Sequence, residues 1–243
     1  MIRRAMVLAA GRGTRLAPLT DTIPKPLAPV ADKPFLEHLL ARLARGGIRD
    51  VVINLHHLGH LIEQAIGDGS RFGLHVRYSP EPTILDTGGG IKQAEPLLGG
   101  EPFLVVNGDS LLEVDLADVA AFHRARGGIA TVALRPDPDA ARYGLVEIDA
   151  GQRMRRIVGL PPGAPSQALR GYMFPGLHVL DPAIFAHMDA GAAFSITRVT
   201  YPLLLAADLP VYGYVTSARW INIDTPDALA AADRELRMRP VKP

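Results

Sequence analysis

Apolar and polar positions in the first half of the chain alternate between two patterns. Short apolar or alternating runs predict strands at residues 5–10, 50–55, 74–79, 103–109 and 129–134. Apolar residues at helical spacing predict helices at residues 34–47, 58–69, 88–98 and 116–128. Strands that alternate with helices of this length predict right-handed crossovers, and therefore a mostly parallel sheet covered on both faces.

The pattern changes near Pro136, after which strand patterns follow one another without long helices between them. These strands are predicted at residues 143–149, 154–160 and 172–180, with a loop rich in glycine and proline over 159–171. Two short helical stretches, strands at 211–215 and 219–224, and an alanine-rich helix at 225–238 with Thr225 as its N-cap complete the chain. The pattern predicts an α/β protein with a Rossmann-like, mostly parallel sheet flanked by helices and a smaller mixed sheet.

Composition narrows the classes of function. The 243 residues carry a formal net charge of +1, which gives the whole molecule no general affinity for nucleic acid or anionic membranes. The absence of cysteine excludes disulfides, thiol catalysis and thiolate metal sites. No apolar run reaches the roughly 18 residues of a membrane-spanning helix and no signal-peptide pattern is present, so we expect a cytoplasmic protein.

A cationic glycine loop follows the first predicted strand. The stretch LAAGRGTRLAPLTDTIPKP, residues 8–26, contains Arg12, Arg15 and Lys25 and no acidic residue before Asp21. Backbone N–H groups in such a loop can hold an anion, and Lys25 is restricted by a proline on each side. The loop lacks the third glycine of the dinucleotide fingerprint and the Gly-Lys-Ser/Thr of the Walker pattern. We therefore expect the loop to bind phosphate, but as a phosphate loop of neither the dinucleotide-binding nor the Walker type.

Two aspartates follow predicted strands. Asp109 ends the run VVNGD, at the carboxyl end of a buried strand, where open parallel sheets place their ligands. Asp224 lies in WINIDTP, just before the terminal helix. Two carboxylates together with phosphate oxygens and waters form a suitable octahedral Mg²⁺ site. A turn or a helix cap would use an aspartate equally well at either position.

The pattern G-x-G-T-R followed by P-K-P closely resembles the signature of the sugar-1-phosphate nucleotidyltransferases. EPTILDTGGGI, VVNGDS, YGLVEID, PGLHVL and WINIDTPDAL also occur in the order found in that family. TGGGI combined with NGD looks most like the N-acetylmuramic acid 1-phosphate uridylyltransferases, and guanylyltransferases acting on mannose or heptose 1-phosphates are close behind. The resemblance implies a GT-A-like fold and the condensation of a nucleoside triphosphate with a sugar 1-phosphate, which releases pyrophosphate.

The resemblance also implies roles for individual residues. Catalytic roles fall to Arg15, Lys25 and Asp109, and the metal ligands for Mg²⁺ are Asp109 and Asp224. The residues implied in nucleotide binding are Leu8, Ala10, Gly11, Gly13, Thr14, Arg15, Glu81, Gly88 and Gly89. The residues implied in sugar-phosphate binding are Lys25, Asn107, Gly144 and Gly176.

The choice of base and of sugar stays open. Glu81 occupies the base-reading position, and as an acceptor it would suit uracil or guanine; Asp86 is the rival candidate. UTP is favoured over GTP on overall resemblance alone. Many relatives carry Glu-Lys-Pro where this chain reads Gly159-Leu160-Pro161, so the lysine that contacts the sugar phosphate in them is absent here.

We expect one nucleotidyltransferase domain over residues 1–243. It comprises a nucleotide-binding core (1–135), a sugar-phosphate-binding region (136–220) and a C-terminal part with a metal ligand and a helix (221–243). The partners expected are a nucleoside triphosphate and a sugar 1-phosphate, with no nucleic acid and no membrane, and the protein is expected to be a monomer or a small homo-oligomer. Two other hypotheses are an inactive regulatory subunit that binds NDP-sugar and a dinucleotide-dependent oxidoreductase. A regulatory subunit would not need to keep Arg15, Lys25, Asp109 and Asp224 together. An oxidoreductase would need the third glycine of the dinucleotide fingerprint, which this chain lacks.

Overall fold

A seven-stranded sheet forms the centre of the protein in the computed structural model, which describes residues 2–162 and 168–240. Its strands are β1 (Arg4–Leu8), β4 (Asp50–Leu55), β5 (His75–Pro80), β6 (Phe103–Asn107), β8 (Ala130–Leu134), β12 (Leu177–Leu180) and β13 (Val211–Val215). Their order is β13-β8-β12-β6-β1-β4-β5. Of these seven strands, β12 alone runs antiparallel to its neighbours, β6 and β8, which confirms the prediction of a mostly parallel sheet.

Helices cover both faces of this sheet because its strands carry apolar residues on both sides. One face packs against α1 (Phe35–Arg45), α2 (Gly59–Ile66) and α5 (Leu116–Arg126). The other packs against α3 (Asp86–Gln93), α4 (Glu95–Leu98), the 3₁₀ segment η5 (Pro182–His187) and α7 (Tyr201–Ala206). One turn of π-helix, η6 (Ile196–Thr200), leads into α7.

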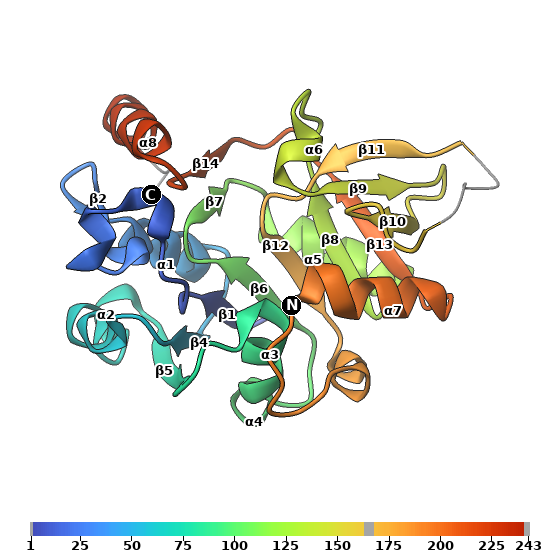
Figure 1. Ribbon diagram of the computed structural model, residues 1–243, viewed down its shortest axis with the longest axis horizontal. Coiled ribbons are helices and arrows are strands. Elements are labelled where there is room, and N and C mark those ends of the chain that lie inside the picture. Colours follow the sequence, from blue (N-terminus) through green and yellow to red (C-terminus); the bar gives the residue numbers. More distant parts are fainter. Residues whose placement is uncertain (1, 163–167, 241–243) are drawn as a thin grey trace.

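A three-stranded antiparallel sheet lies beyond the β8–β13 edge, at the opposite end of the molecule from α1, α2 and α8 (Figure 1). It consists of β9 (Leu145–Ile148), β10 (Met154–Ile157) and β11 (Arg170–Met173), and the short helix α6 (Ala140–Tyr143) precedes it. This confirms the expected mixed region after Pro136. The division at residues 135 and 220 stays a prediction, although the large sheet takes β12 and β13 from the middle part.

Two short strand pairs and a third apolar cluster join the C-terminus to the rest. The pairs are β7 (Ser110–Leu112) with β14 (Trp220–Asn222) and β2 (Pro29–Val30) with β3 (Lys33–Pro34). They pack under α8 (Pro226–Met238), whose N-cap Thr225 accepts a hydrogen bond from the Ala228 N–H at 3.2 Å, as the sequence predicts.

Two predicted elements are wrong in part. The strand predicted over 172–180 divides at Pro175 and Gly176, because Pro175 has no N–H for a ladder and Gly176 adopts a φ of +85°. The chain thereby passes from the small sheet to the large one. The helix predicted over 88–98 starts at Asp86 and divides into α3 and α4, the second of which places Pro96 in its first turn. Part of the predicted 159–171 loop lies outside the described residues.

Within the described ranges, no helix combines the length and the apolar character needed to cross a membrane.

A buried polar pair lies between the large sheet and α7. His178 of β12 and Tyr201 of α7 are 1% and 0% exposed, and a hydrogen bond joins the His178 Nδ1 and the Tyr201 hydroxyl. Burial lowers the pKa of His178 to about 3, so the imidazole is neutral in the folded protein.

We expect acid to destabilise the fold through His178. The native pKa of about 3 lies below the value of about 6.5 for an unfolded histidine, so the unfolded state binds the proton first as the pH falls. This histidine should therefore remove about 1.4 kcal/mol of unfolding free energy per pH unit below pH 6.5. Urea unfolding between pH 7.5 and 4.5 measures this slope. His178→Asn should be less stable at pH 7.5 but have a shallower slope, whereas the exposed-site control His75→Asn should keep the slope. Equal slopes in all three proteins would contradict the assignment.

Candidate active site

A cleft of about 430 Å³ opens at the carboxyl ends of β1, β4 and β6, where parallel sheets bind ligands. Its lining residues are Leu8, Ala10, Gly11, Asn54, Ile84, Asp86, Thr87, Asn107, Asp109 and Ala193. Four residues predicted from the sequence to bind nucleotide or sugar phosphate, Leu8, Ala10, Gly11 and Asn107, lie in this lining, together with the predicted metal ligand Asp109. The strand ends that form the cleft thus collect polar groups from distant parts of the sequence.

The cationic loop consists of three single 3₁₀ turns, η1 (Thr14–Leu16), η2 (Leu19–Asp21) and η3 (Lys25–Leu27). Gly13 has a φ of +64°, and a Cβ added there would lie 2.9 Å from the Cβ of Lys25. The Thr20 hydroxyl donates to the Gly13 carbonyl at 3.0 Å. Gly13 therefore allows the start of the loop to pack directly on the stem of Lys25, while Arg12 and Thr14 stay exposed.

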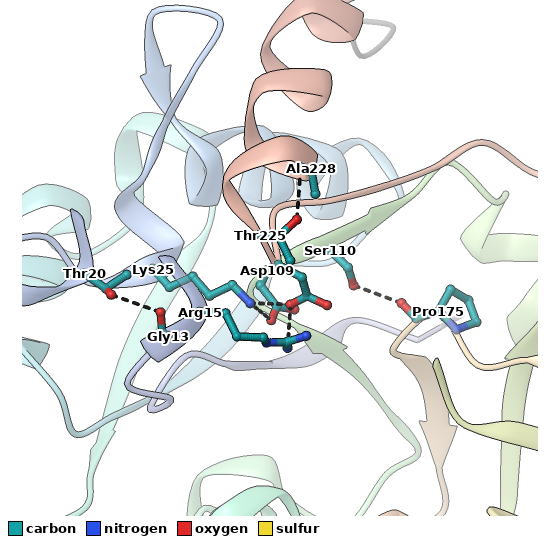
Figure 2. Close-up of polar contacts among 10 residues, drawn as sticks. Gly13, Arg15, Thr20, Lys25, Asp109, Ser110, Pro175, Thr225 and Ala228 are labelled. Atoms are coloured by element: carbon teal, nitrogen blue, oxygen red, sulfur yellow. Dashed lines mark hydrogen bonds and ion pairs between the residues drawn. The ribbon is translucent and has the colours of Figure 1, made fainter. Parts of the chain in front are cut away.

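Lys25 is the charged centre of the site. Lys25 is 7% exposed, and its Nζ lies 2.6 Å from Asp109 Oδ2 and 2.5 Å from Asp224 Oδ1. Figure 2 shows the Lys25 side chain extending toward Asp109. Arg15, which is exposed, places its Nη2 3.2 Å from the same Asp224 oxygen. Two cations and two carboxylates predicted from separate motifs therefore meet at one point.

The pairing of β7 with β14 brings the two aspartates together. Asn222 pairs with Ser110, and the Ile223 N–H donates to the Asp109 carbonyl at 3.1 Å. Asp109 directly precedes β7 and Asp224 closely follows β14, so this antiparallel ladder fixes the two carboxylates at the same end. The sequence predicted β14 but not β7.

The same two carboxylates fit a magnesium ion. The side chains of Asp109 and Asp224 are 30% and 21% exposed and already share one cation, so both present oxygen atoms to the same point. Two carboxylates with substrate phosphates and waters suit Mg²⁺. Among residues 2–162 and 168–240 there is no cluster of three or more His, Cys, Asp or Glu side chains placed to hold a metal. His56 and His57, which precede α2, hydrogen bond to the carbonyls of Glu81 and Thr20.

A second group of predicted residues lies where β6 meets β12. The Asn107 N–H donates to the Gly176 carbonyl at 2.9 Å, and a Cβ at residue 176 would lie 2.5 Å from Asn107 Nδ2. The Ser110 hydroxyl donates to the Pro175 carbonyl at 2.9 Å. Gly176 therefore lets the chain pass close to Asn107 at the edge of the cleft. Gly144 has a φ of +104°, a Cβ added there would lie 3.8 Å from Val158 Cγ1, and its role with sugar stays a prediction.

A buried polar network that the sequence did not predict lies beside the cleft, and Asn54 is the member that lines it. The Ala9 N–H donates to Asn54 Oδ1 at 2.7 Å, and Asn54 Nδ2 donates to Glu81 Oε1 at 2.7 Å. The Leu85 N–H donates to Glu81 Oε2 at 2.9 Å. Asn54 and Glu81 are 3% and 4% exposed, so the network fixes the ends of β1, β4 and β5 relative to α3. An asparagine near the end of the apolar run DVVINL was the available signal.

This network changes the interpretation of Glu81. Both carboxylate oxygens already accept hydrogen bonds inside the protein, and the side chain is almost fully buried. Recognition of a base by Glu81 stays a prediction. It would require a further hydrogen bond at a carboxylate that already accepts from Asn54 and from the Leu85 N–H.

The three glycines of TGGGI allow close packing of α3. A Cβ at Gly88 would lie 2.2 Å from the Phe194 ring, and one at Gly90 would lie 2.6 Å from Glu81 Oε1. The N–H groups of Gly88 and Gly89 donate to the Phe194 carbonyl at 2.8 and 3.2 Å. A nucleotide contact at Gly88 or Gly89 stays a prediction that rests on atoms other than these N–H groups.

Comparison with known proteins decides the family. The sequence profile described as "Nucleotidyl transferase" matches residues 4–239, which is nearly the whole chain. The chain belongs to the nucleotidyl transferase family.

Two curated members of this family show how close the resemblance is. An N-acetylmuramate alpha-1-phosphate uridylyltransferase from Neisseria meningitidis serogroup B is 42% identical over 200 residues, covering 81% of this chain and 83% of that protein. A mannose-1-phosphate guanylyltransferase from Mycobacterium tuberculosis is 34% identical over 233 residues. That match covers 96% of this chain but 64% of the relative, so the chain spans less than two thirds of the second protein's length.

The nucleotidyl transferase fold is also seen in a solved structure. HddC from Yersinia pseudotuberculosis, complexed with GMP-PN, superposes with a TM-score of 0.78 at 25% identity, over 97% of this chain and 100% of that one. This agreement confirms the α/β fold expected from the sequence.

Exchanging the donor and the acceptor across the Asn54–Glu81 hydrogen bond tests the buried polar network. In Glu81→Gln, one of the two N–H groups facing residue 81 meets another donor, and we expect unfolding free energy to fall by about 1–3 kcal/mol. Asn54→Asp places two carboxylates in contact and should cost at least as much. The double variant restores every hydrogen bond, because the amide introduced at position 81 can donate to the carboxylate introduced at position 54 and still accept from the Leu85 N–H. Urea unfolding should therefore show the double variant recovering most of the loss; additive losses would contradict the network.

Proposed function

We propose that this nucleotidyl transferase joins a nucleoside triphosphate to a sugar 1-phosphate and releases pyrophosphate, with UTP and N-acetylmuramic acid 1-phosphate as its substrates. The observation that carries the proposal is the convergence of Lys25 with Asp109 and Asp224, which lie 84 and 199 positions from it in the sequence. The relative from Neisseria meningitidis, with 42% identity, supports the choice of substrates.

The proposed reaction needs positive charge and alignment of the two substrates more than it needs a general base. A phosphate monoester has a second pKa of about 6, so the attacking sugar-phosphate oxygen is already ionised at neutral pH. Repulsion between two polyanions is then the main obstacle, and positioned cations and backbone donors reduce it. Lys25 would bridge the reacting phosphates, while Arg15 and the N–H groups of the loop from residue 11 would hold the triphosphate and the departing pyrophosphate.

The surroundings of Lys25 support this proposed role. The prolines on either side fix its backbone, Gly13 packs on its stem, and its ammonium is held by two carboxylates. A preorganised cation costs little reorganisation when charge develops near it. Asp109 and Asp224 would also hold Mg²⁺, which when bound neutralises phosphate charge at the α-phosphorus.

A guanylyltransferase is the second candidate function. The mannose-1-phosphate guanylyltransferase relative is 34% identical, and the HddC structure contains GMP-PN. Pyrophosphate release from four nucleoside triphosphates against muramic, mannose, heptose and glucose phosphates decides between the candidates. We expect the highest kcat/KM with UTP and N-acetylmuramic acid 1-phosphate. A maximum with GTP would favour the second candidate, and no turnover with any pair would contradict both and favour a regulatory subunit.

Replacement of the central cations should slow turnover greatly. We expect Lys25→Met, which keeps the length of the side chain without its charge, and Arg15→Ala to lower kcat by about 10²–10³, the scale of one preorganised electrostatic group. Steady-state pyrophosphate assays measure the change, and circular dichroism checks that the variants fold. Lys33→Met, at an exposed lysine of β3, is the matched control and should keep the wild-type kcat. A Lys25→Met enzyme with more than half the wild-type kcat would refute the assigned role.

Activity should also depend on a divalent cation. Removal of metal with EDTA should abolish pyrophosphate release, and added Mg²⁺ should restore it. Asp109→Asn and Asp224→Asn each remove one anionic oxygen ligand, so each should raise the Mg²⁺ concentration needed for half-maximal activity by about tenfold or more. Full activity in EDTA, or an unchanged Mg²⁺ titration in both variants, would rule out this metal site.

A further inference from the structure

Two consecutive histidines directly follow β4, at the edge of the large sheet where the cleft opens. The His56 Nδ1 lies 2.9 Å from the Glu81 carbonyl, just after β5, and the His57 Nε2 lies 2.8 Å from the Thr20 carbonyl in the cationic loop. A carbonyl can only accept a hydrogen bond, so each of these ring nitrogens carries the hydrogen. The segment after β4 is therefore bonded to the end of β5 and to the cationic loop.

His57 makes the main polar contact between the first part of the cationic loop and the body of the protein. Within the described ranges, its bond to Thr20 is the one hydrogen bond that joins residues 10–23 to residues outside this segment. The other polar contact is the ion pair of Arg15 with Asp224, in which the Arg15 side chain is 66% exposed. Exposed ion pairs contribute little to holding a segment in place. The position of residues 10–23 therefore depends strongly on His57.

Thr20 connects this contact to the charged centre of the site. Thr20 is 2% exposed, and its hydroxyl donates to the Gly13 carbonyl at 3.0 Å. Gly13 in turn packs on the stem of Lys25, since a Cβ added at Gly13 would lie 2.9 Å from the Lys25 Cβ. His57 thus holds Thr20, Thr20 holds Gly13, and Gly13 lies against Lys25. A shift of Thr20 would move the start of the loop relative to the Lys25 ammonium.

We propose that His57 is a positioning residue that keeps the phosphate-binding loop aligned with Lys25, acting through Thr20 and Gly13 rather than on the substrate. The residue after it, Leu58, has a φ of +51°, a costly conformation for leucine, so the turn that carries His57 is maintained against local preference. This inference rests on the proposed function, because it requires the loop and Lys25 to bind phosphates.

Binding of inorganic pyrophosphate tests the proposal independently of turnover, of the base and of the sugar. Its dissociation constant, with Mg²⁺ present, is measured calorimetrically for each protein. His57→Ala should raise this constant by about tenfold, the upper scale of one lost neutral hydrogen bond. His57→Gln should recover most of the wild-type affinity, because the amide Nε2 can donate to the same carbonyl. His60→Ala, at an exposed histidine of α2, is the matched control and should bind pyrophosphate as the wild type does.

Kinetics separate positioning from a general loss of folded protein. In the pyrophosphate-release assay, His57→Ala should lower kcat and raise the KM for the nucleoside triphosphate, each by about tenfold, because a displacement of about 1 Å near the reacting atoms can cost up to about 10²-fold. The KM for the sugar 1-phosphate should stay within about twofold. A smaller folded fraction would instead lower kcat alone and leave both KM values unchanged.

A second variant tests the path through Thr20. Thr20→Val removes the hydroxyl that bonds to Gly13 while keeping the shape of the side chain, so it should weaken pyrophosphate binding in the same direction as His57→Ala. The two changes interrupt one chain of contacts, so the double variant should lose less affinity than the two single losses combined. Thr20→Val and His57→Gln also provide the test if His57→Ala does not fold.

Several results would overturn the inference: an unchanged pyrophosphate affinity in His57→Ala, no recovery in His57→Gln, fully additive losses in the double variant, or a wild type that does not bind pyrophosphate. Pyrophosphate binding that responds to His57 as expected, without turnover of any substrate pair, would refute the proposed function alone and would leave the role of His57 in place.

Discussion

The Lys25 ammonium lies between the carboxylates of Asp109 and Asp224, at 2.6 and 2.5 Å, and this arrangement ties three distant segments into one site. A buried lysine is costly unless its charge is paired, and two carboxylates that face one point repel each other unless a cation lies between them. The pairing therefore serves both halves: it makes burial of Lys25 tolerable and keeps two acidic groups side by side. Magnesium would need the same two groups.

The surrounding apolar cluster provides the mechanical support for this ion pair. Leu111 of β7 and Ile221 and Ile223 around β14 pack with Phe35 of α1 and Leu236 of α8. Because these side chains are all nearly fully buried, the backbone next to both aspartates is held in place by close packing. Packing of the C-terminal helix thus helps to fix the positions of Asp109 and Asp224, although α8 itself contributes no side chain to the described lining of the cleft.

Much of this could be predicted from the sequence, because strands and helices of the core have strong periodic patterns and the loop residues form a specific signature. Asp109 and Asp224 are recognisable for the same reason. What the sequence did not reveal depends on long-range pairing: Ser110–Leu112 is too short to show a strand pattern, and only its contact with Trp220–Asn222 makes it one. Likewise, nothing local indicates that Glu81 is occupied by Asn54 and Leu85, since those contacts form only when β4, β5 and α3 pack together.

The antiparallel strand β12 determines when, during synthesis of the chain, the large sheet can be completed. It is inserted between β6 and β8, so these two strands, which come earlier in the chain, never touch in the sheet. A nascent chain that has reached only residue 135 would expose an unpaired edge on each of these strands, with no partner yet made. The two strands can be joined only after residues 177–180 are made, β13 (Val211–Val215) then completes the sheet, and Asp224 comes later still. The continuous sheet, and after it the pair of carboxylates, can therefore form only when most of the chain has been synthesised.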